Sequence, residues 1–306
     1  MRSAGWDDDP ALLLMKRIVH LAIWSVCVLW STSLQAQSAV ERGEYIFRAS
    51  GGCSCHTDAD RGGAFMAGGR ALQTPFGAIY STNITPDPET GIGRWSDGDF
   101  LRAMREGIAP DGSHYYPAFP YTSFTGMRTR DVLDLKAYLF SLPAVKKENL
   151  PNQLPPPFSW RSTLALWKMM HFAEGTFTED ASQSEAWNRG AYLVEAVAHC
   201  AECHTERTAT GGLRQDRAYA GTAVGPEGEM APNITPDRAT GVGAWSMPDM
   251  TWYLQSGLEP DGDSVQGVMW EVIEQGYQHL SEEDLEAIAL YLRSLAPIEH
   301  AVGAGD

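Results

Sequence analysis

The chain repeats itself with a period of about 150 residues, and this repetition restricts its fold more than any other feature. The five residues that begin at Asn83 return unchanged at Asn233, and the Arg-Gly pair that begins at Arg42 returns at Arg189. A period shared by separate landmarks indicates two copies of one folding unit. We therefore expect two homologous domains.

The repeated landmarks, and the composition between them, set the expected boundaries. We expect a first repeat over residues 39–147 and a second repeat over residues 184–298. Residues 148–183 begin with prolines and continue with aromatic and apolar residues, so we expect a strap that packs on both repeats. Residues 299–306 are expected to form a disordered tail.

Residues 1–38 have the pattern of a secretory signal peptide. Two basic residues precede an apolar run, and small and polar residues follow it. The run is short for a transmembrane helix. We therefore expect a periplasmic or otherwise exported protein that is soluble once the signal peptide is removed.

The net charge favours proteins over nucleic acids as partners. The formal charge is −16, and nucleic-acid binding needs clustered Lys and Arg to neutralise phosphates. An acidic surface instead suits a partner protein with a positively charged face. We expect no nucleic-acid partner.

Helical patterns dominate both repeats. Ser96 with Asp99, and Ser246 with Asp249, resemble capping boxes that open helices. A further helix is expected after Ser281, because apolar residues there recur at helical spacing. Few segments alternate as strands do, so the expected fold class is all-α, with long loops.

The cysteines give the clearest chemical prediction. The four cysteines outside residues 1–38 lie in two clusters, each followed directly by histidine. In the second repeat Cys200, Cys203 and His204 match C-x-x-C-H, the attachment pattern of c-type haem. Two thiols add to the porphyrin vinyl groups, and the histidine binds iron. A thioredoxin-like pair, a disulfide and half of a zinc site are alternatives, but a histidine after both clusters favours haem.

The first repeat departs from this pattern. Cys53, Cys55 and His56 form C-x-C-H, in which one residue is missing between the cysteines. The shorter gap strains a loop that must bond both vinyl groups. We expect Cys55 and His56 to hold haem, with Cys53 either bonded or left as a thiol; the alternative is a repeat that has lost its haem. The expected cofactors are two covalent haem c groups, with His56 and His204 as iron ligands.

The distal iron ligand is predicted for the second repeat and stays open for the first. Met269 lies in the loop before the last helix, and methionine thioether suits an electron-transfer haem. Phe119 stands at the same place in the first repeat and cannot bind iron. His114 and Met127 flank Phe119, so an open or weakly held iron, ligation by His114 and ligation by Met127 are the three options.

Two residue types that recur around these motifs are candidates for binding the haem propionates. The amides of Asn83 and Asn233, and the indole N–H groups of Trp95 and Trp245, are hydrogen-bond donors that suit propionates. The alternative is a turn for the asparagines and core packing for the tryptophans.

Together these motifs resemble the dihaem and trihaem cytochrome c subunits that accompany membrane-associated alcohol, gluconate and aldehyde dehydrogenases. The resemblance extends from residue 40 to residue 298. The segments that carry it are 62–65, the two Asn-Ile-Thr-Pro-Asp runs, 116–121, 187–194 and 200–204.

This resemblance implies two tandem class I cytochrome c-like haem domains. In that family the position of Phe119 is often methionine, the distal ligand. The resemblance also implies that electrons enter from a periplasmic dehydrogenase and leave to a quinone or a terminal acceptor of the respiratory chain. Any association with a membrane would then be peripheral and through these partners.

Three functions stay open at this level. The first is an electron-transfer protein, in which protein groups tune two haems. The second is a dihaem redox enzyme, peroxidase-like or thiosulfate-oxidising, which uses an open first haem. The third is a docking subunit with one functional haem. Carbon monoxide binding and turnover of peroxide or thiosulfate discriminate the enzyme from the carrier.

Overall fold

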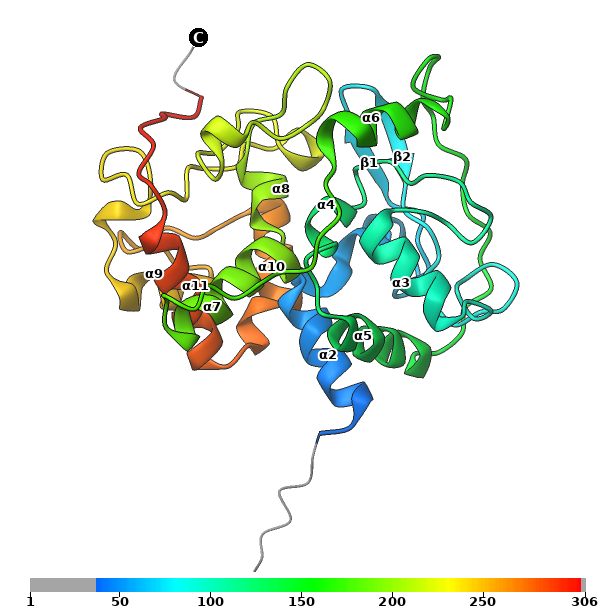
Figure 1. Ribbon diagram of the computed structural model, residues 1–306, viewed down its shortest axis with the longest axis horizontal. Helices are drawn as coiled ribbons and strands as arrows, with labels where there is room; N and C mark the ends of the chain where they lie inside the picture. Colours follow the sequence, from blue (N-terminus) through cyan, green and yellow to red (C-terminus); the bar gives the residue numbers. More distant parts are fainter. Residues whose placement is uncertain (1–36, 304–306) are drawn as a thin grey trace, which may run out of the picture. The chain divides into compact units, whose positions relative to one another are not determined.

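The computed structural model describes residues 37–303, which form helices joined by long loops (Figure 1). The expected helical fold class is confirmed at the level of secondary structure. The expected signal peptide, residues 1–38, falls outside the described residues apart from its last two. No helix within the described residues is long and apolar enough to cross a membrane.

The two repeats share one order of elements. The first repeat contains α2 (Ala39–Ala49), η1 (Gly51–His56), η2 (Ala59–Arg61), α3 (Asp97–Glu106), α4 (Tyr121–Phe124) and α5 (Thr129–Ser141). The second repeat contains α7 (Glu185–Tyr192), η3 (Leu193–Val197), α8 (Cys200–His204), η4 (Gln215–Arg217), η5 (Pro226–Gly228), η6 (Val242–Ala244), α9 (Met247–Ser256), α10 (Gly267–Gln275), η7 (Tyr277–His279) and α11 (Glu282–Ser294). The counterparts are therefore α2 and α7, η1 and α8, α3 and α9, α4 and α10, and α5 and α11.

The first repeat also contains a small hairpin that the sequence did not predict. Strands β1 (Ala71–Thr74) and β2 (Gly77–Tyr80) pair antiparallel, with Leu72 opposite Ile79. The hairpin is short, and its side chains are mostly half-buried. A two-strand ribbon of this length depends on packing against the rest of the protein.

The expected capping boxes open α3 and α9. The Ser96 hydroxyl accepts a hydrogen bond from the Asp99 backbone N–H, and the Asp99 carboxylate accepts one from the Ser96 backbone. Ser246 and Asp249 form the same reciprocal pair. Ser281 caps α11 in the simpler way, with its side chain accepting from the third residue of the helix. These predictions are confirmed.

The first helix of each repeat crosses its last helix at a glycine. A Cβ atom built on Gly43 would lie 1.8 Å from the carbonyl oxygen of Asp134, in α5. A Cβ atom on Gly190 would lie 1.9 Å from that of Ala287, in α11. Only glycine permits such close contact, so these two glycines fix the helix crossing that frames each repeat.

The repeated Asn-x-Thr-Pro-Asp run is a turn that binds the end of its own repeat. Asn83 Nδ2 donates to the carbonyl of Val145 at 2.7 Å and to Thr90 Oγ1 at 3.1 Å. Asn233 Nδ2 donates to the carbonyl of Ile298 at 2.8 Å and makes the matching bond to a threonine hydroxyl. The matching geometry shows that both amides have their donors engaged by protein acceptors.

The strap is hydrogen-bonded to both repeats through helix α6 (Thr163–His171). Lys168 Nζ donates to the carbonyls of Glu106 and Gly107, which lie at the C-terminal end of α3. Trp167 Nε1 donates to the carbonyl of Thr210, in the second repeat, at 2.9 Å. A cation at a helix C-terminus is favourable, so Lys168 anchors the strap electrostatically as well.

The repeats meet through an exchange of matched contacts. Tyr45, in α2, donates its hydroxyl to Asp284, the third residue of α11. Tyr192, the counterpart of Tyr45 in α7, donates to Asp131, the third residue of α5. In each repeat the equivalent tyrosine donates a hydrogen bond to the equivalent aspartate of the other repeat, which is the pattern of a contact with two-fold symmetry. Buried apolar residues of both repeats form one continuous core across it.

Candidate functional site

Each repeat carries its cysteines and histidine on an attachment loop that follows its first helix: η1 in the first repeat and α8 in the second. His56 Nδ1 donates to the carbonyl oxygen of Thr82 at 2.7 Å, and His204 Nδ1 donates to that of Pro232 at 2.8 Å. A carbonyl can only accept, so Nδ1 carries the proton and the Nε2 lone pair is available to a metal. The same hydrogen bond fixes the orientation of each ring.

Both imidazoles are held in the state that a metal requires. Burial lowers the pKa of His56 and of His204, although the backbone carbonyl beside each ring raises it. The charged form is therefore disfavoured, and both rings are neutral near neutral pH. Neutral histidine is the form that coordinates metal.

The loop after each histidine is also repeated in detail. Gly68 N–H donates to the carbonyl of His56 at 2.7 Å, and Gly221 N–H donates to that of His204 at 2.8 Å. A returning backbone segment thus braces each histidine through its main chain, in addition to the Nδ1 partner of its ring. Local sequence alone does not reveal this brace, because its two halves are separated by a loop.

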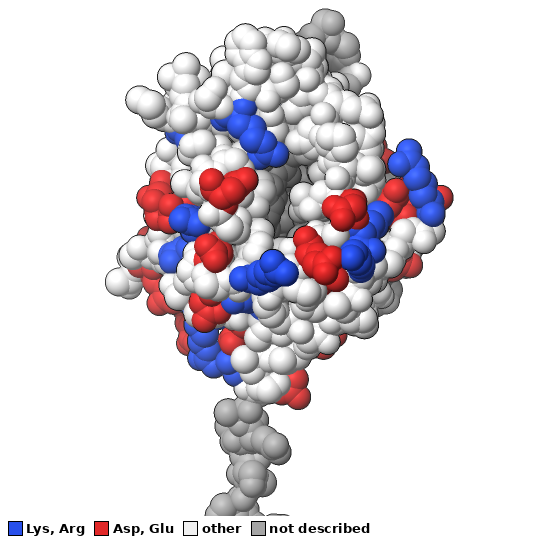
Figure 2. All heavy atoms as spheres, turned by 90° about the vertical axis from the view of Figure 1, so that its right-hand side faces the viewer, with Lys and Arg blue, Asp and Glu red and all other residues white. Residues whose placement is uncertain are grey.

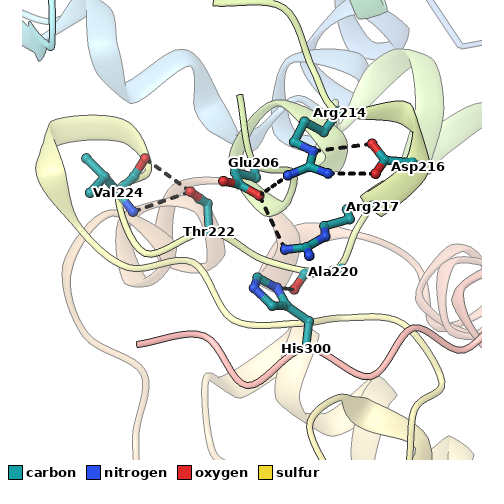
Figure 3. Close-up of polar contacts among 8 residues, drawn as sticks. All are labelled: Glu206, Arg214, Asp216, Arg217, Ala220, Thr222, Val224 and His300. Carbon is teal, nitrogen blue, oxygen red and sulfur yellow. Dashed lines mark hydrogen bonds and ion pairs between the residues drawn. The ribbon is translucent and has the colours of Figure 1, made fainter. Parts of the chain in front are cut away.

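A cluster of ion pairs stiffens the returning loop of the second repeat. Glu206 pairs with Arg214 at 3.3 Å and with Arg217 at 3.6 Å, and Arg214 also pairs with Asp216 at 2.7 Å (Figure 3). Isolated surface pairs contribute little to stability, but a network that joins several turns restrains the loop more than one pair does.

His300 extends the second repeat beyond its expected boundary. His300 Nδ1 donates to the carbonyl of Ala220 at 2.8 Å (Figure 3), and its backbone N–H donates to Thr240 Oγ1. Lys147 has the same place in the first repeat, where its Nζ donates to the carbonyl of Gly68. The expectation of a disordered tail from residue 299 is therefore corrected: the repeated pattern continues to residue 300.

The four cysteines of the described residues are free thiols with a suppressed tendency to ionise. Burial raises the pKa of Cys53 to about 11 and those of Cys200 and Cys203 to about 12, and it also raises the pKa of Cys55. A redox-active dithiol needs a lowered thiol pKa, so this environment disfavours a thioredoxin-like pair. Within residues 37–303 no group of three or more Cys, His, Asp or Glu residues is placed to hold a metal ion.

The shortened first loop closes through left-handed backbone. Gly51, Gly52 and Cys53 have φ values of 77°, 70° and 48°, whereas the second loop has one such residue, His199, at 46°. Left-handed conformation is free of strain for glycine and unfavourable for cysteine. Gly52 and its counterpart His199 share this conformation, so the left-handed residues specific to the shortened loop are Gly51 and Cys53.

A cavity of about 1890 Å³ lies beside the first loop, and Figure 2 shows a hollow on this face. Its lining includes Cys53, Cys55 and His56. It is also lined by apolar side chains: Trp95, Phe100, Met104, Phe119, Phe124, Met127, Leu135 and Leu139. This space exceeds the roughly 300–1,000 Å³ of an ordinary small-ligand pocket. Two thiols, a neutral imidazole and a large apolar cavity fit a covalently held haem.

The candidate distal ligands of the first repeat differ in their access to this cavity. Met127 and Phe119 line the cavity, and Met127 is fully buried. His114 is not among the lining residues, and its Nδ1 is buried without a hydrogen-bond partner. In the second repeat the expected loop position of Met269 is corrected: Met269 lies in helix α10 and packs, partly buried, against the core.

The recurring tryptophans have different surroundings. Trp95 lines the cavity of the first repeat, next to Phe100 at a centroid distance of 6.5 Å. Trp245 packs edge-on against Tyr253 at 5.2 Å. The two asparagines, as described above, have their amide hydrogens engaged in turns. The geometry therefore favours the turn for Asn83 and Asn233.

Sequence reasoning missed Glu202, which lies between the cysteines of the second loop. Its buried carboxylate accepts from Thr122 and Ser123 of α4, and it pairs with Arg207 at 2.6 Å. An ionic contact also joins the two repeats, where Arg70 pairs with Glu227 at 2.8 Å and also with Glu271. A charged residue inside C-x-x-C was the available signal, but the hydroxyl partners of Glu202 lie about 80 residues away in the other repeat.

A helical chain with two matched loops, each holding cysteines beside a neutral and anchored histidine, is compatible with a c-type cytochrome. It belongs to the family of dihaem c-type cytochromes and cytochrome c subunits of dehydrogenases. The chain is 42% identical over 262 residues to the protein named "Diheme cytochrome c-type" of Cereibacter sphaeroides, which covers 84% of this chain and 86% of that one. No protein-family model matches the chain.

Two further relatives are named as parts of dehydrogenases. A nicotinate dehydrogenase subunit of Pseudomonas putida is 42% identical over 279 residues, which cover 90% of this chain and 22% of that protein. The fructose dehydrogenase cytochrome subunit of Gluconobacter japonicus is 39% identical over 289 residues, which cover 90% of this chain and 58% of that subunit. The chain thus spans only part of the length of both relatives.

Proposed function

We propose that the chain is an electron-transfer protein that carries two covalently attached haem c groups, one in each repeat. The matched environment of His56 and His204 is the observation that carries this proposal: each ring is neutral, anchored through Nδ1 and placed beside two cysteines. Membership of the c-type cytochrome family supports it. Haem, when bound, supplies one-electron redox chemistry, and the protein supplies ligands and burial.

In the second repeat Cys200 and Cys203 hold the haem through thioethers, and His204 is the proximal ligand. Met269 is the distal ligand, because it lies in the segment before the last helix and packs against the core of that repeat. A thioether ligand raises the reduction potential, which suits an electron carrier.

In the first repeat Cys55 holds the haem and His56 is the proximal ligand. The left-handed φ of Cys53 and its place on the cavity wall leave this thiol near the haem, either bonded or free. The distal position is open or weakly held, because Phe119 lines the cavity where the second repeat has methionine. His114 and Met127 are the two alternative ligands, and of these only Met127 lines the cavity.

The proposed electron donor is a dehydrogenase outside the cytoplasm, and the proposed acceptor is a quinone or a terminal acceptor of the respiratory chain. Relatives named as cytochrome subunits of fructose, gluconate and alcohol dehydrogenases support the donor. The net charge of −16 suits a partner with a positive face. Electron transfer to such a partner slows as salt rises; a rate indifferent to salt contradicts this steering.

The intact mass of the mature protein tests the proposal. The full chain is made with an export and haem-attachment system, and its mass is measured under denaturing conditions, so that only covalent haem is counted. A mass with two haems supports the two-centre carrier. A mass with one haem reduces the chain to a docking subunit with one redox centre, and a mass without haem refutes the proposed function.

A second function, a dihaem redox enzyme, is favoured by one observation: Phe119 leaves the cavity without methionine at the expected distal place. An open ferrous iron binds carbon monoxide, whereas a six-coordinate iron resists it. The measurement is the carbon monoxide difference spectrum of the reduced protein, followed by assays for peroxide and thiosulfate turnover. Carbon monoxide binding without turnover of peroxide or thiosulfate supports the electron carrier and contradicts the enzyme.

A further inference from the structure

Each attachment loop packs against the short helix that precedes the last helix of the other repeat. In η1, a Cβ atom built on Gly52 would lie 2.7 Å from the Cβ of Gln275, in α10. In α8, Glu202 accepts hydrogen bonds from Thr122 and Ser123, in α4. Because α4 and α10 are counterparts, the two loop–helix contacts are equivalent. They are related by the same approximate two-fold symmetry as the two tyrosine–aspartate contacts.

The two loops are also close enough to interact electrostatically. Burial is the main cause that raises the pKa of Cys203, and the nearby Cys55 raises it further. Cys55 and Cys203 are counterparts, each placed directly before the histidine. Counterpart residues that are neighbours lie near the two-fold axis, so the attachment loops meet at the centre of the contact between the repeats.

One side chain reaches from the second loop into the first repeat. His199 directly precedes Cys200, and its ring lies 5.3 Å from that of Phe124, edge to face. His199 also lines the cavity that Cys53 lines. Its Nδ1 is buried without a hydrogen-bond partner.

Ser50 connects this ring to the first attachment loop. Burial lowers the pKa of His199, while the Glu202 carboxylate and a hydrogen bond with the Ser50 backbone raise it. The Ser50 hydroxyl in turn lies 3.6 Å from Cys53 Sγ. Ser50 therefore lies between Cys53 of the first loop and His199, which directly precedes Cys200.

We propose that His199 is a positioning residue that joins the two attachment loops and sets the rate of electron exchange between the two haems. The inference rests on the proposed function and adds the route between its two centres. One electron leaves the reduced haem of one repeat and reduces the oxidised haem of the other; no bond breaks and no proton is transferred. Gly52 takes the counterpart position in the first loop and has no side chain, so the link comes from the second repeat alone.

The test uses the full mature protein with both haems attached, and it compares three variants. His199→Gln removes the ring, and His199→Phe keeps a ring against Phe124 but removes its nitrogens. His279→Gln is the matched control, because His279 is exposed in the same repeat. For each protein, a reductant pulse that delivers less than one electron per molecule is followed by recording the redistribution of absorbance between the two haems.

The expected result is that redistribution slows in both His199 variants by more than any difference between the unaltered protein and the His279→Gln control. The intact mass, the two midpoint potentials and the rate of the control are expected to stay unchanged. Wild-type exchange in His199→Gln, or in His199→Phe alone, overturns the route through the imidazole. Absence of any redistribution in the unaltered protein also overturns it, although a mass with two haems would leave the proposed function standing.

A second variant keeps the test decisive if His199→Gln does not retain both haems. Ser50→Ala removes the hydroxyl beside Cys53 and leaves the second loop intact. It is expected to slow the redistribution as well, with two haems still present by mass. A wild-type rate in Ser50→Ala overturns the path through Ser50, and a mass below two haems in the unaltered protein refutes the proposed function instead.

Discussion

The two attachment loops are alike around the histidine and unlike around the first cysteine. His56 and His204 donate Nδ1 to a backbone carbonyl at 2.7 and 2.8 Å, and a returning glycine braces both. Before them, residues 51–53 all have left-handed backbone in the first loop, whereas His199 alone does in the second. Distant backbone groups hold each histidine, while the cysteine spacing depends on local loop conformation. The loop has therefore changed without displacing His56, the proposed proximal ligand.

The largest expected effect comes from removing single thiols. Cys53→Ala is expected to keep covalent haem in the first repeat, because Cys55 adjoins the histidine, whereas Cys55→Ala is expected to lose it. Cys200→Ala and Cys203→Ala are the matched controls, and each is expected to keep one thioether in the regular second loop. Intact mass under denaturing conditions measures the result. Loss of the first haem from Cys53→Ala would mean that both loops need both thiols.

The distal positions provide the next comparison. Phe119→Met is expected to give the first haem a thioether ligand, with a higher midpoint potential and loss of carbon monoxide binding. Met269→Phe is expected to do the reverse to the second haem. Spectroelectrochemical titration and carbon monoxide difference spectra measure both changes. An unchanged potential in Met269→Phe would remove Met269 as a ligand.

The helix crossings should respond alike in the two repeats. Gly43→Ala and Gly190→Ala each place a methyl group less than 2 Å from a backbone carbonyl, and such overpacking destabilises by about 1–3 kcal/mol. Gly98→Ala is the control, because its added Cβ meets nothing closer than 3.8 Å. Thermal unfolding of the haem-loaded variants measures the effect. Tolerance of alanine at one crossing alone would show that the two frames differ.

The helix caps should give a smaller and equal effect. Ser96→Ala and Ser246→Ala each remove one capping box, at a cost of about 1 kcal/mol. Threonine at either position keeps the hydroxyl and is expected to restore most of the stability. Denaturant unfolding midpoints compare the two variants. A clearly unequal loss would indicate that one helix has a second constraint.

The smallest expected effect is a matched pH dependence. Backbone and side-chain hydrogen bonds from Thr90 lower the pKa of Asp87, and those from Thr240 lower the pKa of Asp237. A lowered folded-state pKa contributes stability that is present at neutral pH and is lost as pH falls below about 4. Asp87→Asn and Asp237→Asn should each flatten this acid dependence slightly. Melting temperatures from about pH 3 to about pH 7 measure it, and a steeper acid dependence in either variant contradicts the assignment.

Local features of the sequence predicted much of the frame. The capping serines and the turn residues interact with groups a few positions away, so their patterns are visible in the sequence. Burial explains why His56 is neutral. The group that orients its ring is the backbone carbonyl of Thr82, 26 residues later, and a backbone carbonyl leaves no trace in the residue types of the sequence. The sequence therefore pointed to His56 as a candidate ligand but not to the carbonyl group that anchors its ring.

Contacts between the repeats were not predictable in the same way. Glu202 reads as a surface residue inside a motif, and its partners on α4 become apparent only when the repeats are packed together. Asn83 and Asn233 were difficult to predict for another reason, because each has two plausible roles. An amide suits a propionate as well as a turn, and the choice depends on acceptors about 60 residues away, at Val145 and Ile298.

The exchanged contacts of Tyr45 with Asp284 and of Tyr192 with Asp131 have a consequence for assembly. A contact in which each half offers the same surface is the kind that two identical chains form as a dimer. In separate chains its occupancy would fall on dilution. Residues 148–183 tether the halves, so the local concentration of each half near the other is set by this segment and not by the cell. Both attachment loops are then present in a fixed one-to-one ratio, and their pairing persists however dilute the protein becomes.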